Sequence, residues 1–360
     1  MNMPAAILYN PIHQDLDRVM MRMGSLWEQF RNESVFITGG TGLFGRWLLE
    51  SMARANRQLD LNVKVTVLTR DAAAFRRQAP QLAQEPGIDF HQGDVRDFDF
   101  PAGRYAYIIH GAATSANETF QGEDPLRKFD TIVTGTRHTL DFATHCGARR
   151  LLLLSSGSAY GVSGNDMSDI PETYMGAPDT VNPDSALGQA KRTAEFLATS
   201  YARQSGLEFV IARCFSFVGP FLPLDIHYAI GNFISHALRE EAITVKGDGT
   251  PVRSYLYMAD LVVWLLTLLA RGRNEQIYNV GSDQALSVRD LAYMVRAVVS
   301  PDKPVAILGQ PAYSVGNEVR NVYVPNIAKA RTELGLGVWT DLESSIRLTA
   351  AYISGAHACH

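Results

Sequence analysis

Cysteine, net charge and long apolar runs are all scarce in this chain of 360 residues, and each scarcity excludes a class of protein. The three cysteines, Cys146, Cys214 and Cys359, are widely spaced and odd in number, so they predict neither a disulfide framework nor a zinc site. The 33 basic and 37 acidic residues give a net charge of −4, without the basic excess usual for nucleic-acid binding. We therefore expect no metal site and no nucleic-acid partner.

The apolar runs are too short for a membrane span. The longest uncharged one, Leu261 to Ala270, is about half of the ~20 residues that a transmembrane helix needs. The first twenty residues contain Asp15 and Asp17 and no continuous apolar core, so no secretory signal is expected. Hydrophobic residues make up 46% and charged residues 19%, an ordinary globular balance. A cytoplasmic protein is the expectation.

Strand and helix signals alternate from Ser34 onward. Short buried strands are predicted at 35–38, 63–68, 88–91, 106–110, 151–155 and 209–212. Helices are predicted after the first strand and at 129–145 and 184–204. This alternation is typical of a parallel sheet with helices on both faces. We predict an α/β fold, a doubly wound parallel sheet of the Rossmann type with a smaller C-terminal α/β lobe.

The chain divides into three regions. Residues 1–33 form an N-terminal helical extension, because apolar residues between 14 and 30 recur at helical spacing. This helix either packs on the domain that follows or forms a dimer contact. Residues 34–220 form a dinucleotide-binding domain, and residues 221–360 form a substrate-binding lobe that is interleaved with it. Helices are predicted in that lobe at 229–240, 260–271 and 287–299.

A glycine-rich loop joins the first predicted strand to its helix. Residues 38–45 are Thr-Gly-Gly-Thr-Gly-Leu-Phe-Gly, in which Gly39, Gly42 and Gly45 form G-x-x-G-x-x-G. Glycine allows a tight turn and lets the backbone approach a pyrophosphate, which then meets the positive end of the helix. With a strand before it and a helix after it, the loop predicts a dinucleotide site.

The end of the second strand leaves the choice between NAD and NADP open. An acid at this position binds a free ribose hydroxyl, whereas an arginine suits a 2′-phosphate. Arg70 follows the strand here, and Asp71 is its neighbour. Arg70 therefore either contacts a phosphate or stacks on adenine, and NAD or NADP is the expected cofactor.

Several further motifs occur in the order found in one family. They are Gly93-Asp94-Val95, His110-Gly111-Ala112-Ala113, Ser155 to Gly161, Arg213 to Pro220 and Gly247 to Tyr255. Together with the glycine loop, they make the chain from about Ser34 to about Leu336 resemble the extended short-chain dehydrogenase/reductase family, in particular its NAD(P)-dependent nucleotide-sugar epimerases and dehydratases. The resemblance implies a nicotinamide cofactor in the first lobe and a nucleoside-diphosphate sugar in the second.

The resemblance also implies roles for single residues. The implied cofactor contacts are Gly39, Thr41, Gly42, Leu43, Phe44, Gly45, Arg70, Asp94, Val95, Ala112, Ala113, Thr114, Lys191 and Phe215. The implied substrate contacts are Ser156, Ser216, Asn232, Phe233, Thr244, Lys246, Arg253 and Arg320. Arg253 matches the arginine that grips the substrate pyrophosphate; the alternative is a solvated surface charge.

The catalytic Tyr-x-x-x-Lys pair of the family is incomplete. Lys191 is in place, but Leu187 occupies the tyrosine position. Leucine cannot carry a proton, and a positioned acid or base contributes about 10²–10⁴-fold in rate. Ser156 matches the catalytic Ser/Thr of the family. Tyr160 either donates a proton or packs near the substrate, so Lys191, Ser156 and Tyr160 are the catalytic candidates.

Three functions remain open at this point. The first is an epimerase or ketosugar reductase that transfers a hydride at a hexose carbon, with C4 favoured, and that uses atypical proton chemistry. The second is a catalytically weakened protein that binds the dinucleotide and sugar nucleotide as a regulatory or partner subunit. The third is a nucleotide-sugar dehydratase. It would be an unusual one, because Gly157 and Ser158 stand where the dehydratases of the family carry an acidic residue. Since many relatives form dimers partly through the helices at 129–145 and 184–204, we expect a homodimer.

Overall fold

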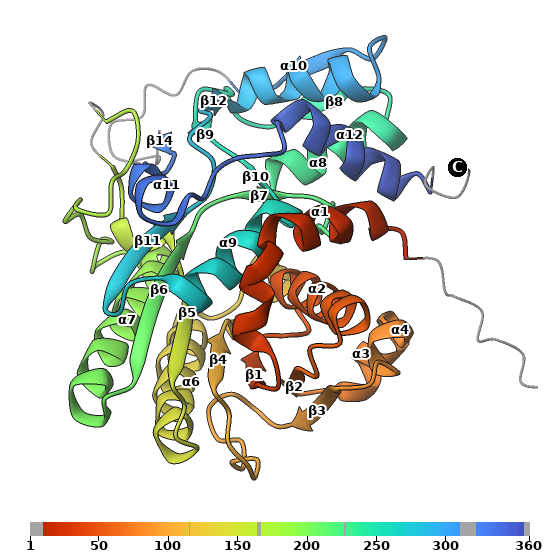
Figure 1. Ribbon diagram of the computed structural model, residues 1–360. Helices are drawn as coiled ribbons and strands as arrows, with labels where there is room; N and C mark the ends of the chain where they lie inside the picture. Colours follow the sequence, from red (N-terminus) through yellow and green to blue (C-terminus); the bar gives the residue numbers. More distant parts are fainter. Residues whose placement is uncertain (1–9, 115, 164–166, 227, 310–321, 356–360) are drawn as a thin grey trace, which may run out of the picture.

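Seven parallel strands form the main sheet (Figure 1). The computed structural model describes residues 10–114, 116–163, 167–226, 228–309 and 322–355. In spatial order the strands are β11 (Gln276–Val280), β6 (Glu208–Cys214), β5 (Arg150–Ser156), β4 (Tyr107–His110), β1 (Ser34–Thr38), β2 (Lys64–Thr69) and β3 (Ile88–Gln92). Every neighbouring pair is parallel. The predicted doubly wound parallel sheet is confirmed.

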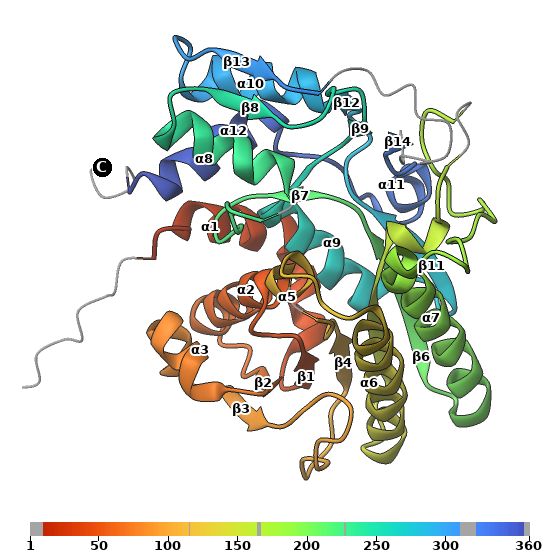
Figure 2. The same ribbon diagram turned by 180° about the vertical axis from the view of Figure 1, so that it is seen from behind.

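Helices cover both faces of this sheet, because successive apolar residues of a strand point to opposite faces. In β1, Val35 and Ile37 belong to one hydrophobic cluster, whereas Phe36 belongs to the cluster on the other face. The first face carries α2 (Leu43–Leu59), α3 (Ala72–Gln78), α4 (Pro80–Ala83) and α9 (Met258–Arg271). The second face carries α6 (Pro125–His145), which follows the short α5 (Ala116–Phe120), and α7 (Ala186–Ser205) (Figure 2).

Helix ends follow local capping chemistry. Helix α6 begins before the predicted residue 129, since the Asp124 side chain accepts a hydrogen bond from the backbone N–H of Leu126 and Pro125 occupies the first turn. Helix α7 follows the short 3₁₀ helix η3 (Pro183–Ser185) and ends at Gly206, which adopts the left-handed conformation. These bounds place Leu187 and Lys191 in the first two turns of α7.

The N-terminal extension packs on the domain that follows. Helix α1 (His13–Met23) ends at Gly24, whose φ of 47° suits glycine, and the chain continues as the 3₁₀ helix η1 (Gly24–Phe30). The single helix predicted over 14–30 is therefore two elements. Leu16, Val19 and Trp27 are buried in the same cluster as α2 and α9. Of the two roles considered for this extension, packing on its own domain is the one observed.

The C-terminal region forms a second, smaller layer above the carboxyl edge of the main sheet (Figure 1). Its helices are α8 (Ala229–Arg239), α10 (Val288–Val299) and α12 (Leu342–Ile353), whereas α11 (Ala328–Leu334) packs beside β11 against the cluster on the first face of the main sheet. The strands of the second layer pair as β7 (Phe217–Val218) with β10 (Leu256–Tyr257), β8 (Ile243–Val245) with β13 (Val305–Ile307), and β9 (Val252–Arg253) with both β12 (Leu286–Ser287) and β14 (Val322–Tyr323). Apolar residues of α8, α10 and α12 form a core of their own.

The chain returns from the second layer to the main sheet between β10 and β12. After β10, the chain leaves the second layer as α9, crosses the first face of the main sheet, and adds β11 beside β6 at its edge. It then returns to the second layer as β12. Residues on both sides of position 220 therefore build the main sheet.

Candidate functional site

The carboxyl ends of the parallel strands meet at one edge of the main sheet. Because β1 lies between β4 and β2, the chain leaves β1 and β4 toward opposite sides, and this switch point is where open α/β sheets bind ligands. The predicted residues at this edge are the glycine loop after β1, Arg70 after β2, Asp94 after β3, Ala112 after β4, Ser156 at the end of β5 and Phe215 after β6.

The backbone of the glycine loop explains its glycines. Gly39 has a φ of 74°, and a Cβ there would lie 2.7 Å from the carbonyl carbon of Gly111. A Cβ on Gly45 would lie 2.3 Å from the Cα of Gly40. Gly42 is the N-cap of α2 and has no side chain to occupy the first N–H groups of the helix. The loop thus offers the close approach and free amides that a dinucleotide pyrophosphate requires.

The other predicted cofactor residues line the neighbouring strand ends. Thr41 is half-buried in the loop, and Leu43 and Phe44 open α2 against the core. Ala112 and Ala113 pack against the cluster on the second face, and Thr114 follows them, half-buried. Val95 is 8% exposed, and its methyl group lies 2.7 Å from where a Cβ of Gly135 would be. Because these side chains are small, they occupy little space at the strand ends.

A buried polar network ties β1 to β4 beneath the loop. The Thr38 hydroxyl oxygen accepts a hydrogen bond from the backbone N–H of Ala112 at 3.1 Å and lies 2.7 Å from Nδ1 of His110. Nε2 of His110 lies 3.0 Å from the Thr136 hydroxyl. Burial lowers the pKa of His110 to about 3, so its imidazole is neutral at pH 7. The network fixes the loop and carries no charge into the site.

Ion pairs already engage the residues expected near the adenine. Arg70 lies 3.4 Å from a carboxylate oxygen of Glu118. Asp94 accepts hydrogen bonds from Nε and Nη2 of Arg96 at 2.9 and 3.2 Å, and this pairing holds the pKa of Asp94 below its ordinary value. Because the carboxylate of Glu118 already neutralises Arg70, the guanidinium does not need a 2′-phosphate as its partner.

Lys191 lies fully inside the protein at the end of β5. Its ammonium group donates to the carbonyl oxygen of Leu154 at 2.6 Å. Burial lowers the pKa of Lys191 to about 8, against the opposing influence of Cys214 and Glu195. Burial also raises the pKa of the Cys214 thiol to about 12, so Cys214 is protonated beside the lysine. Lys191 is therefore not a solvated lysine on a helix surface.

Glu195 organises the wall behind Lys191, one helical turn further along α7. Its carboxylate pairs with the Arg213 guanidinium through hydrogen bonds of 2.9 and 2.6 Å and accepts a third from the Ser155 hydroxyl at 2.5 Å. Arg213 in turn lies 4.2 Å from the centroid of the Tyr160 ring. All three charged or polar partners of this group are buried, so the arrangement is rigid.

The two other catalytic candidates differ in their surroundings. The Ser156 hydroxyl oxygen is half-buried and accepts a hydrogen bond from the backbone N–H of Ser158 at 3.1 Å, opening the 3₁₀ helix η2 (Gly157–Tyr160). The Tyr160 side chain is fully buried, and its hydroxyl donates to the side-chain oxygen of Asn279 at 2.8 Å. Burial raises the pKa of Tyr160 to about 12. This geometry favours packing over proton transfer for Tyr160. Leu187 is half-buried against the cluster that contains Ala112 and Ala113.

The predicted substrate residues of the second lobe are dispersed. Arg253 lies on β9, half-buried, with its guanidinium 5.9 Å from the ring centroid of Tyr323. Ser216 follows Phe215, and its carbonyl oxygen accepts the backbone N–H of Leu256 at 3.0 Å. Asn232 is half-buried on α8, Phe233 is 3% exposed within the lobe core, Thr244 is half-buried on β8 and Lys246 is exposed. Arg320 lies outside the described residues.

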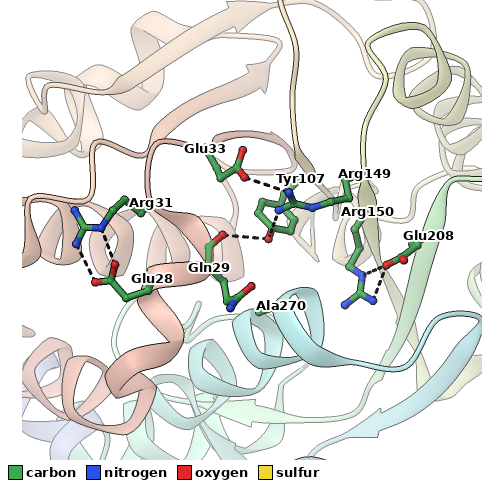
Figure 3. A pocket seen from close by; sticks show the side chains of 9 residues that line it. All are labelled: Glu28, Gln29, Arg31, Glu33, Tyr107, Arg149, Arg150, Glu208 and Ala270. Carbon is green, nitrogen blue, oxygen red and sulfur yellow. Dashed lines mark hydrogen bonds and ion pairs between the residues drawn. The ribbon is translucent and has the colours of Figure 1, made fainter.

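A polar hollow occupies the opposite, amino-terminal edge of the sheet (Figure 3). It is lined by Glu28, Gln29, Arg31, Glu33, Tyr107, Arg149, Arg150, Glu208 and Ala270. Each of its three arginines pairs with a glutamate, at 2.6 Å for Arg31, 3.2 Å for Arg149 and 2.7 Å for Arg150. These pairs leave the hollow without a charge to recognise a phosphate, so the carboxyl edge remains the candidate site.

Known proteins share this architecture. Residues 35–281 match the model of the NAD dependent epimerase/dehydratase family. The chain belongs to this family. UDP-glucuronic acid decarboxylase 6 of Arabidopsis thaliana is 29% identical over 306 residues, which are 84% of this chain and 84% of that protein. The expected NAD-dependent, nucleotide-sugar-modifying enzyme is thus confirmed at this general level.

Solved structures extend the likeness of this epimerase/dehydratase-family protein at the level of the fold. UDP-glucose 4-epimerase of Thermotoga maritima, solved with UDP-glucose, has a TM-score of 0.72 and 21% identity, covering 90% of this chain and 99% of its own. The dTDP-glucose 4,6-dehydratase DesIV of Streptomyces venezuelae, solved with NAD, has a TM-score of 0.72 and 23% identity, covering 89% and 97%. Within the described ranges, none of the helices of the family member is both long and apolar enough to cross a bilayer.

Two features of the site were missed in the sequence. Glu195 follows Lys191 by four residues on one helix, and that spacing predicts that both lie on the same face. The position of Glu195 beside Lys191 could therefore have been predicted. The position of Tyr323 in the site could not have been predicted. Tyr323 reaches the active-site edge only because β14 pairs with β9, and no local pattern signals that pairing.

Proposed function

We propose that this protein oxidises or reduces a hexose carbon, C4 favoured, of a nucleoside-diphosphate sugar, as an epimerase or ketosugar reductase with atypical proton chemistry. One observation carries the proposal. The buried Lys191 ammonium group is fixed 2.6 Å from the Leu154 carbonyl, two residues before Ser156 and at the same sheet edge as the glycine loop. A burial of this kind costs stability, and a dinucleotide ribose at this edge is the partner that accounts for it.

The residues of this chain divide the work between two ligands. The amides of the glycine loop hold the dinucleotide pyrophosphate, and Lys191 holds the nicotinamide ribose. When bound, the nicotinamide supplies hydride exchange. Ser156 orients the reacting sugar hydroxyl, and Arg253 binds the substrate diphosphate, for which a planar guanidinium is suited. NAD is preferred over NADP because Arg70 already has Glu118 as a partner.

A second candidate outcome is decarboxylation of a sugar acid, and the likeness to UDP-glucuronic acid decarboxylase favours it. Oxidation at C4 of a uronic acid places a carbonyl group β to the C6 carboxylate, and such acids lose carbon dioxide readily. The first step is the same as in the epimerase, so the same residues serve both outcomes. A regulatory protein with the same fold would bind both ligands without converting either.

The test begins with the ligands that the protein carries. The purified protein is denatured, and the released small molecules are identified by mass spectrometry. The protein is then incubated with NAD or NADP and a panel of UDP-, dTDP- and GDP-hexoses and UDP-glucuronic acid, and products are separated by chromatography. Epimerised, reduced or decarboxylated product supports an enzyme and names its outcome.

Two variants tie turnover to the site. Arg253→Ala is expected to raise KM for the sugar nucleotide and to leave the affinity for the dinucleotide unchanged. Lys191→Met is expected to weaken the binding of the dinucleotide. Lys303→Met is the matched control, because Lys303 also donates to a backbone carbonyl, of Ala237 at 2.7 Å, but lies in the second lobe. If the protein binds neither NAD nor NADP, the proposed function is wrong.

We also propose a cytoplasmic homodimer formed through α6 and α7. These helices pack side by side, and large apolar side chains on them are exposed: Leu126 is 78%, Phe129 36% and Phe196 69% exposed. The described cysteines, Cys146 and Cys214, are free and buried, which suits a reducing compartment.

A further inference from the structure

We propose that Tyr323 is the acid/base that exchanges the substrate proton in place of the tyrosine that Leu187 replaces. The inference rests on the proposed function and names a catalytic residue for it. Leucine leaves the helix α7 side of the site without a proton carrier. Tyr323 enters the same site from the opposite side, on β14 of the second lobe.

The Tyr323 ring lies directly on the backbone of Gly157. A Cβ built on Gly157 would lie 2.7 Å from the Tyr323 hydroxyl oxygen and 2.9 Å from each of two ring carbons. Any side chain at position 157 would therefore displace the ring. Gly157 follows Ser156 directly, so the missing side chain gives the phenol of Tyr323 a place beside the predicted catalytic serine.

Two ligand-binding residues flank the same ring. Its centroid is 4.6 Å from that of Phe215, which is predicted to contact the cofactor. In the register of β14 with β9, Tyr323 is the direct partner of Arg253, which is predicted to bind the substrate diphosphate. A sugar nucleotide that places its diphosphate on Arg253 and its sugar at Ser156 must pass its sugar alongside Tyr323. The tyrosine thus lies between the two anchor points of the substrate.

The backbone around Tyr323 is fixed on both sides. The Val322 carbonyl accepts a hydrogen bond from the Ser163 hydroxyl at 2.9 Å. The Val324 carbonyl accepts one from the backbone N–H of Ile170 at 2.8 Å. With β9 on its other edge, the segment is held as a strand between two elements. Such positioning is what an acid/base needs, since proton transfer depends on a defined distance to the reacting oxygen.

Two other tyrosines near the site bond to its scaffold. The Tyr160 hydroxyl donates to Asn279 in the interior. The Tyr174 hydroxyl donates to the Val162 carbonyl oxygen at 3.1 Å. Each of these hydroxyls has a partner outside the Ser156–Gly157 segment, and the Tyr323 hydroxyl lies beside Gly157.

The chemistry balances with the groups already named. In the oxidation, the Tyr323 side chain would take up the proton of the hexose C4 hydroxyl, and a nicotinamide held by Lys191 and the glycine loop would accept the hydride from C4. In the reduction, the Tyr323 hydroxyl gives a proton to the carbonyl oxygen at C4 while the hydride returns to the carbon. Each complete turnover of an epimerase thus restores both tyrosine and nicotinamide.

Tyr323→Phe is the test, since phenylalanine keeps the ring on Gly157 and Phe215 and removes only the hydroxyl. We expect kcat with the sugar nucleotide that the wild type converts to fall about 10²–10⁴-fold. Calorimetric affinities for NAD and for UDP should stay at the wild-type values. The pH profile of kcat should differ from that of the wild type. Tyr174→Phe is the matched control, a hydroxyl deletion on a nearby tyrosine, and is expected to keep the wild-type profile.

Two further variants separate proton chemistry from packing. Leu187→Tyr, made in the Tyr323→Phe background, should restore turnover, because it returns a phenol to the helical position four residues before Lys191. Gly157→Ala should reduce kcat about as much as Tyr323→Phe does. In the double variant, kcat should be little lower than in Tyr323→Phe alone.

The outcomes are distinct. A wild type that converts sugar nucleotides while Tyr323→Phe keeps its kcat and pH profile overturns the inference and leaves the proposed function standing. A wild type that binds no dinucleotide, or binds both ligands and converts nothing, overturns the proposed function and the acid/base role with it.

Discussion

Replacement of the buried Lys191 by methionine is expected to stabilise the protein without ligands. Methionine has nearly the shape of the lysine stem but no charge to strip of water. The Lys191 side chain is buried, and its ammonium group donates to the carbonyl oxygen of Leu154. If the charge is held in the interior for a ligand, as proposed above, its removal should raise the free energy of unfolding of the ligand-free protein.

The magnitude follows from the pKa. Burial lowers the pKa of Lys191 from its ordinary 10.5 to about 8, and that difference corresponds to about 3 kcal/mol of destabilisation below pH 8. The variant loses a hydrogen bond from a charged donor to Leu154, which costs about 1.5–3 kcal/mol. A net gain of up to about 1.5 kcal/mol should remain at pH 7.

The sign of the pH dependence is fixed by the same values. Between about pH 8 and 10.5 the unfolded chain binds the lysine proton and the folded protein does not, so wild-type stability rises with pH in this window. The advantage of Lys191→Met should therefore shrink across it by about 1.4 kcal/mol per pH unit.

Urea denaturation followed by circular dichroism at several pH values from 7 to 10 measures both effects, with Lys303→Met as the control that should show no gain. Calorimetry should show that Lys191→Met binds NAD more weakly. A variant less stable than the wild type at pH 7, or a stability difference that does not change with pH, would refute the reasoning.

Three other predictions test the loop, the buried ion pair and the dimer. Gly39→Ala forces a φ of 74° on alanine with its Cβ 2.7 Å from Gly111, so it should cost about 2 kcal/mol or more in thermal unfolding and abolish NAD binding; retained affinity contradicts the loop assignment. Glu195→Ala leaves the Arg213 guanidinium buried without its carboxylate and should cost about 3–5 kcal/mol in urea, whereas a cost under about 1 kcal/mol would show that water replaces it. Phe196→Glu should convert the proposed homodimer to monomers in analytical ultracentrifugation with an unchanged far-ultraviolet spectrum; an unchanged sedimentation coefficient argues against the α7 interface.

Local signals made the glycine loop and its surrounding strand and helix predictable. The strand, the turn glycines and the apolar face of α2 follow one another in the sequence, and close backbone contacts require glycine at positions 39 and 45. The order of strands could be predicted only as far as a parallel sheet, since the sequence does not state which strand lies at which edge. The helix over 14–30 was predicted too long because an apolar pattern continues through Gly24 although the backbone changes there.

Contacts between distant segments account for what could not be predicted. The Tyr160 hydroxyl finds its partner in Asn279, and Tyr323 finds its place over Gly157, in each case across more than a hundred residues of sequence. Neither partner carries a local motif. The sequence thus identified which segments meet at the carboxyl edge, while the role of each tyrosine there depends on the second lobe.

The late arrival of β11 has a consequence for synthesis. Strand β6 ends at Cys214 and β11 begins at Gln276, so the ribosome must add the 61 residues 215–275 before the last edge of the main sheet can close. At translation rates of 5–20 residues per second, this takes about 3–12 s. During that interval the edge of β6 presents unpaired backbone N–H and C=O groups on the nascent chain, and α9 is not yet available to cover the apolar face of the strand. Growing chains of this protein should therefore depend on a holding chaperone more than the refolding full-length protein does.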